Sequence, residues 1–527
     1  ATGSVELLRA NGGSATILDN FSYTVGRHSI KAGFEIRWYH YGRSNGQNPI
    51  YFMDTVQDIL NSSPRSSDIT TAFPSTSRMR TTEIGIYVQD DFRVRPDLTL
   101  NLGLRWEHYT PATEREGRLF NVVDSPYGPF RPKGQGIWGP DYNNFGPRFG
   151  LAWEMFGSRK NVIRAGSGVF YSENMLRNVS IASRSPELPF TLTLDRADNP
   201  NLRYPIDPFN IDLSRFAAPV NRLLIDPHHR TSYAVQWSFD YQREVTPNLT
   251  VSAGYVGTHG LKFLQLNFLN QIDETGRRPV VGVGQIRWEG QDGMSIYHSL
   301  QMSARKRFSH GLTFNVHYTY GKSITNGGGS EEGINDVQDW RNIRGSRSRT
   351  SISLAHAMNF NYGWDVPLNR LLGPNPAGAL KLLLDGWRIN GITTFRTGFP
   401  IEIQSGRDAF GSGSARGQRP NYIGGDIRAG TDDYRTSNLH NYINRAAFSP
   451  NTRFQYGNLG GWILTGPGSQ VYDFSIFKNT PIRERLALQF RTEFFNFFNH
   501  TNFGGPNANL NSGLFGRITG AGGPREI

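Results

Sequence analysis

Few positions in the chain have the residue types that phosphate binding or nucleophilic catalysis requires. Gly321, Lys322 and Ser323 match the end of a phosphate-binding loop, in which backbone amides and a lysine hold phosphate oxygens. That motif needs another glycine five residues before Gly321, and Val316 occupies this position. The glycine-serine run at 411–414 lacks the spacing of a nucleophile elbow. We therefore expect neither a nucleotide site nor a nucleophilic serine at these positions.

Histidine and carboxylate groups are also poorly arranged for metal binding or proton transfer. His228–His229 is the one close histidine pair, and a pair on a long loop is more typical of a solvated loop than of a zinc site. The acidic residues between 331 and 339 fit no calcium-loop spacing. Adjacent Asp90–Asp91 would point to opposite faces of a strand and cannot share a proton. We predict no catalytic residue, no metal ion and no cofactor, and hence no enzymatic activity.

The densest basic run could bind an anion. It comprises Arg341, Arg344, Arg347 and Arg349 and lies in a loop-like segment. Guanidinium groups at such spacing can face an anionic ligand, although a solvated loop is the simpler interpretation. The formal net charge of +12 can indicate nucleic acid, anionic lipid or an anionic ligand. Because Lys and Arg are dispersed along the chain, we expect no nucleic-acid partner.

A period of two in the sequence predicts the elements that carry these residues. In the stretch IGIYVQDDFRVRPDLTLNLGLRWEHY, residues 84–109, the even positions are mostly apolar and the odd positions mostly polar. Successive side chains of a strand point to opposite faces, so the stretch predicts two strands with one apolar face each. Pro96–Asp97 between them suits a tight turn. The alternation recurs, and we predict seven hairpins at about 15–41, 84–109, 148–171, 232–258, 297–324, 353–397 and 473–497.

The lengths of the strands and of their connections favour a membrane barrel. Each strand has about 10–15 residues, enough to cross a bilayer with tilt, whereas strands of globular domains usually have about 5–6. Short turns alternate with long loops, as in barrels with short periplasmic turns and long extracellular loops. No window has the roughly 18 apolar residues of a membrane helix. The absence of cysteine excludes a disulfide framework. We predict an all-β protein, an antiparallel transmembrane β-barrel of about 14 strands.

In such a barrel the apolar face contacts lipid and the polar face lines the lumen. The residues predicted to face lipid are Ile84, Ile86, Val88, Leu100, Leu102, Leu104, Phe314, Val316, Leu488 and Phe490. The residues predicted to face the lumen are Arg37, Arg105, Glu107, Gln236, Asn315 and Arg491. Aromatic residues make up 13% of the chain, and a girdle at the membrane interfaces is predicted at Trp38, Trp106, Trp153, Trp237 and Trp364. A soluble sheet would turn the apolar face inward instead.

Four segments carry a resemblance to a known family. They are YVQDDFRVRPDLTLNLGLRWE at 87–107, YHSLQMSARKRFSHGLTFNVHYTYGKSI at 297–324, GWRINGITTFRTGFP at 386–400 and PIRERLALQFRTEFFNFFNHTNFG at 481–504. In this order they resemble the barrel of TonB-dependent outer-membrane transporters of the Oar-like type. The resemblance runs from about Asp19 to Gly520. It implies a 22-stranded barrel in the outer membrane of a Gram-negative bacterium, which passes a ligand across that membrane by energy coupling.

The resemblance also implies partners. Members of this family carry an N-terminal plug and contact the TonB complex, and the outer membrane supplies lipid and lipopolysaccharide, which the basic loop residues could contact. The first residues, ATGSVELL, are not a signal peptide. We expect residues 1–527 to be one barrel domain, the central and C-terminal part of such a barrel, without the plug and the final strand. A passive porin-like barrel, an outer-membrane enzyme and a soluble all-β binding or adhesion protein are the alternatives.

Overall fold

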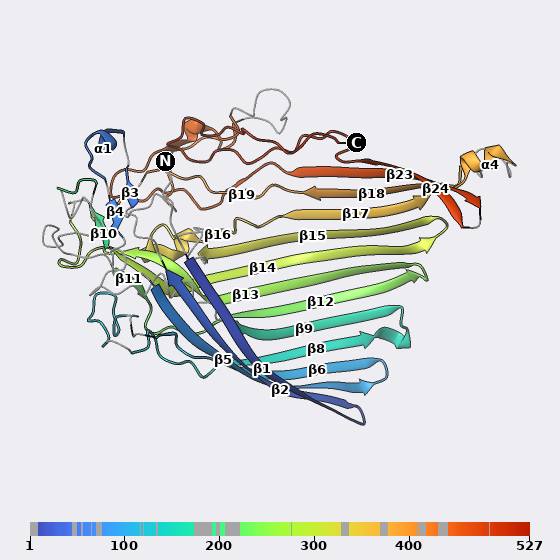
Figure 1. Cartoon of the computed structure of the whole chain (residues 1–527), viewed down its shortest axis with the longest axis horizontal. Coiled ribbons are helices and arrows are strands. Elements are labelled where there is room, and N and C mark those ends of the chain that lie inside the picture. Colours follow the sequence, from blue (N-terminus) through green and yellow to red (C-terminus); the bar gives the residue numbers. More distant parts are fainter. Residues whose placement is uncertain are drawn as a thin grey trace.

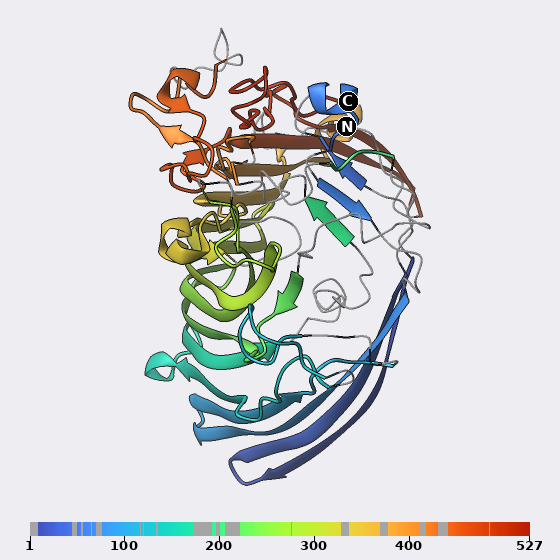
Figure 2. The same cartoon turned by 90° about the vertical axis from the view of Figure 1, so that its left-hand side faces the viewer.

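The computed structural model describes residues 9–526 except 45–49, 54–55, 65, 70–75, 116, 118, 120, 133–134, 173–191, 196–200, 206–221, 274, 276, 328–336, 369–377, 408, 411–417, 430–440 and 484. The glycine-serine run at 411–414 and the acidic residues Glu331, Glu332 and Asp336 lie outside the described residues. Within these residues the chain forms a curved wall of long strands, with loops gathered at one end (Figures 1 and 2). We call this end the loop end and the opposite end the turn end.

Fourteen long strands of the described chain form the wall. They are β1 (Arg9–Val25), β2 (His28–Ser44), β5 (Thr76–Arg95), β6 (Leu98–Tyr109), β8 (Phe145–Glu154), β9 (Asn161–Ser172), β12 (Ser232–Thr246), β13 (Leu249–Leu269), β14 (Ile286–Ser309), β15 (Leu312–Gly327), β17 (His356–Asp365), β18 (Trp387–Arg396), β23 (Ser469–Arg483) and β24 (Leu486–Phe494).

The remaining elements are short. The strands among them are β3 (Ile50–Phe52), β4 (Ser66–Ile69), β7 (Thr113–Glu114), β10 (Leu192–Asp195), β11 (Arg222–Ile225), β16 (Ser348–Arg349), β19 (Pro400–Ile401), β20 (Asn421–Tyr422), β21 (Phe448–Ser449) and β22 (Leu464–Thr465). The helices are α1 (Val56–Leu60) and α4 (Ala379–Leu384), with 3-10 turns at Met155–Gly157, Trp340–Ser346 and Arg445–Ala447. No helix in the described part of the chain is long and apolar enough to span a membrane.

Each wall strand pairs antiparallel with its neighbours in chain order. The seven predicted hairpins are β1–β2, β5–β6, β8–β9, β12–β13, β14–β15, β17–β18 and β23–β24, and β2–β5, β6–β8, β9–β12, β13–β14, β15–β17 and β18–β23 link them. The predicted antiparallel fold is therefore confirmed. The wall does not close, because among the described residues β1 forms a ladder with β2 alone and β24 with β23 alone.

A bulge in β5 keeps the apolar side chains of the first strands on one face. Residues 96–97 form the turn between β5 and β6, and the register shifts between Arg93 and Arg95, which leaves one residue of β5 unpaired. Beyond the shift, Val88 pairs with Leu104. Without the extra residue, Val88 would stand opposite Arg105, because a one-residue slip exchanges the two faces of a strand.

Several wall strands are longer than the predicted 10–15 residues, and the two longest are neighbours. β13 has 21 residues and β14 has 24. Their loop-end halves are covered by other segments, since Leu264, Leu269 and Ile286 are buried. Burial of these side chains at the loop end explains why pairing continues there, and alternation of residue types alone does not indicate it.

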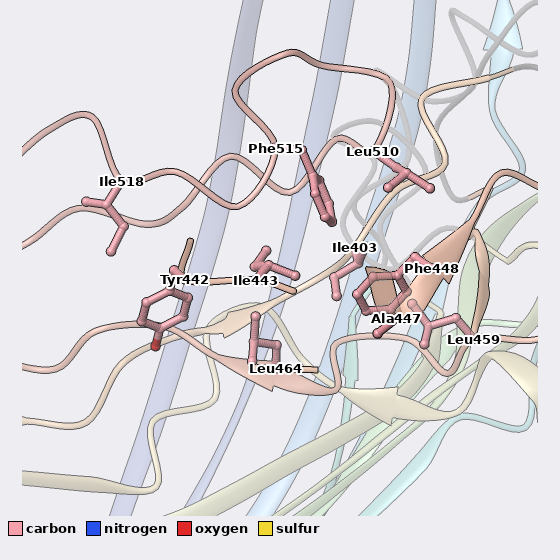
Figure 3. Packing of buried hydrophobic residues seen from close by; sticks show 10 residues of the cluster. All are labelled: Ile403, Tyr442, Ile443, Ala447, Phe448, Leu459, Leu464, Leu510, Phe515 and Ile518. Atoms are coloured by element: carbon pink, nitrogen blue, oxygen red, sulfur yellow. The ribbon is translucent and has the colours of Figure 1, made fainter. Parts of the chain in front are cut away.

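The loops at the loop end have hydrophobic cores of their own. One cluster joins Met79 of β5 to Leu119, Ile137, Trp138 and Ile225 of the loops. A second, which we call the loop core, joins the β18–β23 connection to the segment after β24 (Figure 3). Its buried members are Ile403, Tyr442, Ile443, Ala447, Phe448, Leu459, Leu464, Leu510, Phe515 and Ile518. These loops are therefore packed units and not solvated tethers.

Two strand glycines lie under aromatic rings of the neighbouring strand. Gly257 pairs with Trp237, and a Cβ added to Gly257 would lie 2.3 Å from the Trp237 ring. Gly391 pairs with Tyr362, and its Cβ would lie 2.4 Å from the Tyr362 ring. A ring lying over a strand glycine supplies contacts that glycine lacks.

We expect Gly257→Ala to lower the free energy of unfolding by about 1–3 kcal/mol, because the added methyl group must displace the Trp237 ring. Chemical denaturation in lipid measures the change. Gly166→Ala is the matched control, since a Cβ there would approach no atom closer than 3.6 Å. Equal effects of the two substitutions would show that the ring over Gly257 contributes nothing.

Candidate functional site

The polar face of β2, β5 and β6 carries a network of charged side chains. Arg105 donates from Nε to Glu107 Oε1 at 2.8 Å, and its Nη2 lies 3.5 Å from Glu35 Oε2. Glu35 also pairs with Arg37, whose Nη1 lies 3.9 Å from Glu83 Oε2. The network holds three carboxyl groups and two guanidinium groups, so its formal net charge is −1. It brings together three of the predicted lumen residues.

A glycine makes this network possible. Gly85 stands between Glu35 and Glu107 in the row of paired residues across β2, β5 and β6. A Cβ on Gly85 would lie 2.4 Å from Arg105 Nη2. The guanidinium group of Arg105 therefore crosses β5 over Gly85 and reaches the second strand away. Any larger residue at position 85 would occupy the space that the guanidinium group fills.

A hollow of about 380 Å³ lies among the last strands of the wall, β15, β17, β18, β23 and β24. The polar side chains that line it belong to the same face as the charged network. Its polar lining includes Asn315, Asn361, Arg388, Asn390, Ser475 and Glu493. Arg388 donates from Nε to Asn390 Oδ1 at 3.0 Å, and Gly363 leaves room for both side chains. The buried amide nitrogen of Asn390 has no partner among the described residues. The hollow thus offers amide and guanidinium donors beside carboxylate and amide acceptors.

This arrangement suits binding of polar groups. Amide and guanidinium groups recognise hydroxyl, carbonyl and anionic oxygens through hydrogen bonds. Within the described residues, no group of three or more His, Asp or Glu side chains could hold a metal ion. Gly321–Ser323, the remnant of a phosphate-loop motif, lies inside β15 and not at the start of a helix.

The predicted lipid-facing residues share one face by register. Six of them are exposed: Ile86, Val88, Leu102, Leu104, Leu488 and Phe490. Ile84, Leu100, Phe314 and Val316 are partly covered by neighbours. Pairing aligns Ile86 with Trp106 and Val88 with Leu104, while Val316 aligns with Ala304 and Phe360. That this face contacts lipid stays a prediction.

The remaining predicted lumen residues lie apart from the charged network. Gln236 of β12 stands opposite Gly168 and Thr258 in the middle of the wall. Asn315 lines the hollow. Arg491 of β24 pairs with Glu493, which lines the same hollow. The polar face therefore has two charged or polar centres, and its orientation toward a lumen stays a prediction.

The five tryptophans predicted to form a girdle fall at two levels. Trp38, Trp106 and Trp237 lie toward the loop end, and Trp106 donates from Nε1 to the Tyr142 carbonyl at 2.8 Å. Trp153 pairs with Leu98 and Trp364 with Leu312, so both lie at the turn end. Two levels are what two membrane interfaces would require, and the girdle itself stays a prediction.

The four arginines of the basic loop do not converge. Arg341 bonds to Asp339 at 3.0 Å, and Arg344 and Arg347 are exposed. Arg349 donates to the carbonyls of Trp462 and Leu464 and to Thr465 Oγ1, and burial lowers the pKa of its guanidinium group. Arg349 therefore holds two loops together, which leaves at most the exposed pair for an anion.

The histidine pair does not act as a unit either. His228 Nε2 lies 2.5 Å from Asp124 Oδ1. The His229 ring is buried against Trp138, with 4.6 Å between ring centroids. The two side chains thus serve different loop contacts.

The chain is similar to one protein family and to several solved structures. The model of a family described as "Outer membrane beta barrel domain" matches residues 3–527. No curated protein matches. Among solved structures, the outer membrane transporter YddB from Escherichia coli is similar, with 11% identity, a TM-score of 0.50, and 94% of this chain and 51% of that chain covered.

Two further solved structures are similar at lower scores. The FrpB iron transporter from Neisseria meningitidis has 12% identity and a TM-score of 0.47, with 98% of this chain and 54% of that chain covered. The ferripyoverdine receptor of the outer membrane of Pseudomonas aeruginosa has 12% identity and a TM-score of 0.47, with 99% and 48% covered. The chain therefore spans about half the length of the solved structures that it matches.

Proposed function

This chain belongs to the outer membrane beta barrel domain family, and from that premise we propose that it forms the barrel wall of a TonB-dependent transporter. It lies in the outer membrane of a Gram-negative bacterium. The proposed activity is energy-coupled passage of a ligand across that membrane, with no catalytic role. The proposed partners in the full-length protein are a plug domain and the TonB complex, and lipid and lipopolysaccharide surround the wall.

The observation that carries the proposal is the polar face of the wall. It combines the charged network of β2, β5 and β6 with the hollow between β15 and β24, which polar and aromatic residues line together. Groups of this kind bind a plug surface or a polar ligand by hydrogen bonds that form and break without covalent change. The transporter descriptions of the similar structures agree with the proposal. The ligand itself is left open, because a fold does not specify a ligand.

Liposome swelling separates this proposal from a passive porin. The complete gene product is reconstituted in liposomes, and influx of sugars of increasing size is followed by light scattering. We expect no swelling from a plugged transporter and expect a protonophore to abolish ligand accumulation by intact cells. Size-dependent swelling without an energy source would support the porin instead. A protein that stays monomeric in buffer without detergent would support the soluble alternative.

A further inference from the structure

The short helix α4 presents leucines to its surroundings. It lies in the connection between β17 and β18 at the turn end and projects beyond the ends of β23 and β24 (Figure 1). Leu380, Leu382 and Leu383 are 54%, 50% and 65% exposed. Three exposed leucines in six residues are costly in water, since burying one such side chain gains about 1.5–3 kcal/mol.

Two side chains of the wall hold α4 by its last carbonyl groups. Trp387 donates from Nε1 to the Leu383 carbonyl at 2.7 Å. Lys478 donates from Nζ to the Leu382 carbonyl at 2.7 Å and also to the Asp385 carbonyl. A cation at the last carbonyls is the favourable arrangement for a helix end. These bonds use backbone carbonyls at the end of α4 and not its leucine side chains.

The two holding residues identify the face of the wall to which α4 is attached. Trp387 pairs with Lys478, and Lys478 pairs with Phe490. These three side chains share one face, the apolar face on which Phe490 is 58% and Leu488 is 63% exposed. The end of α4 is therefore attached to side chains of the apolar face at the turn end of the wall.

We propose that α4 is an interfacial helix whose leucines enter the leaflet of the outer membrane at the turn end of the wall. The occupant of this surface is phospholipid: Leu380, Leu382 and Leu383 meet the boundary between headgroups and acyl chains, and Lys381 and Lys478 stand beside anionic headgroups. Apolar side chains with adjacent lysine and tryptophan are the composition of such interfaces. The inference rests on membership in the membrane-barrel family and not on the transport proposal.

The absence of cysteine from the chain allows a clean test. Leu383→Cys is labelled with an environment-sensitive fluorophore in the full-length protein in outer-membrane vesicles, after any cysteine outside residues 1–527 has been replaced by serine. Val281→Cys is the aqueous control, because Val281 is 92% exposed on the connection between β13 and β14. Emission is recorded with a nitroxide quencher attached to lipid acyl chains and with one dissolved in water. Since α4 is held by backbone carbonyls, the substitution leaves its attachment intact.

We expect the label at position 383 to emit to the blue of the label at 281 and to be quenched several-fold more by the lipid-borne nitroxide than by the aqueous one. Emission and quenching equal to those of the control would overturn the proposal. Energy transfer between donor- and acceptor-labelled copies, with blue emission that is lost on dilution into excess lipid, would assign the leucines to a second copy of the chain and would also overturn it.

Discussion

Replacing Leu102 by arginine is expected to lower the free energy of unfolding in a bilayer by about 2–4 kcal/mol, the usual cost of a cation near the middle of a lipid-facing barrel surface. Leu102 lies inside β6, is 46% exposed and pairs with Phe149. Asp90 pairs with it on the other side, where the new arginine could find a carboxylate. Leu102→Arg is therefore also made together with Asp90→Asn, which removes that carboxylate. The full loss of stability is expected in this double variant. Denaturant titration in lipid vesicles measures it.

Asn101→Arg is the control for the Leu102 experiment. Asn101 is the preceding residue on the opposite face, and its Nδ2 donates to Asp91 Oδ1 at 2.6 Å. An arginine there meets a carboxylate and, in our interpretation, water, so its effect should remain below about 1 kcal/mol. If Asn101→Arg proves as costly as Leu102→Arg, or if both are tolerated, the assignment of the apolar face to lipid is wrong.

Removing the guanidinium group at position 105 is the second large effect that we expect. Arg105→Ala should lower the free energy of unfolding by about 1.5–3 kcal/mol, the typical value for hydrogen bonds to charged groups. Arg105 and Glu107 have side chains only 21% and 14% exposed, so water replaces the lost partner poorly. The substitution also leaves Glu35 and Glu107 without the cation that lies between them. Chemical denaturation at low and high salt measures the effect.

The chain offers a matched control in Arg491, which bonds to Glu493 with the same spacing in sequence. That pair is 55% and 39% exposed, so Arg491→Ala should cost about 0–1 kcal/mol. Gly85→Val tests the geometry separately, because it keeps every charge but fills the space that Arg105 crosses. Equal costs for Arg105→Ala and Arg491→Ala would contradict the special role of the network, as would a neutral Gly85→Val.

Much of the wall could be predicted from the sequence, because a strand exposed to two different media repeats its residue types with a period of two. The charged network could be predicted only in part from this alternation. Parity places Arg37, Arg105 and Glu107 on one face, but the contact of Arg105 with Glu35 depends on the register. The bulge at the β5–β6 turn sets that register, and the turn residues alone suggest a pairing shifted by one. Glu35, Gly85 and Glu107 in one row would have indicated the network once the bulge was known.

The loops and the hollow could not be read from such a pattern. The loop core joins residues that lie far apart in the chain, such as Ile403 and Leu510, and no local spacing indicates that they meet. The hollow collects Asn315, Asn390 and Glu493 from three different hairpins, and its only signal is that all three occupy polar positions. Helix α4 was also missed, because ALKLLL is too short for a helical period to emerge.

The loop core has a consequence for the order in which the molecule assembles. Six of the seven hairpins of the wall are joined by a turn of only a few residues, so each of these closes at small entropic cost. The loop core needs the β18–β23 connection and the segment after β24 in place together. The contacts of the loop core can therefore stabilise the protein only after the β23–β24 hairpin has paired with β18. The wall can grow hairpin by hairpin, whereas the loop core is completed only when the β23–β24 hairpin and the segment after it are in place.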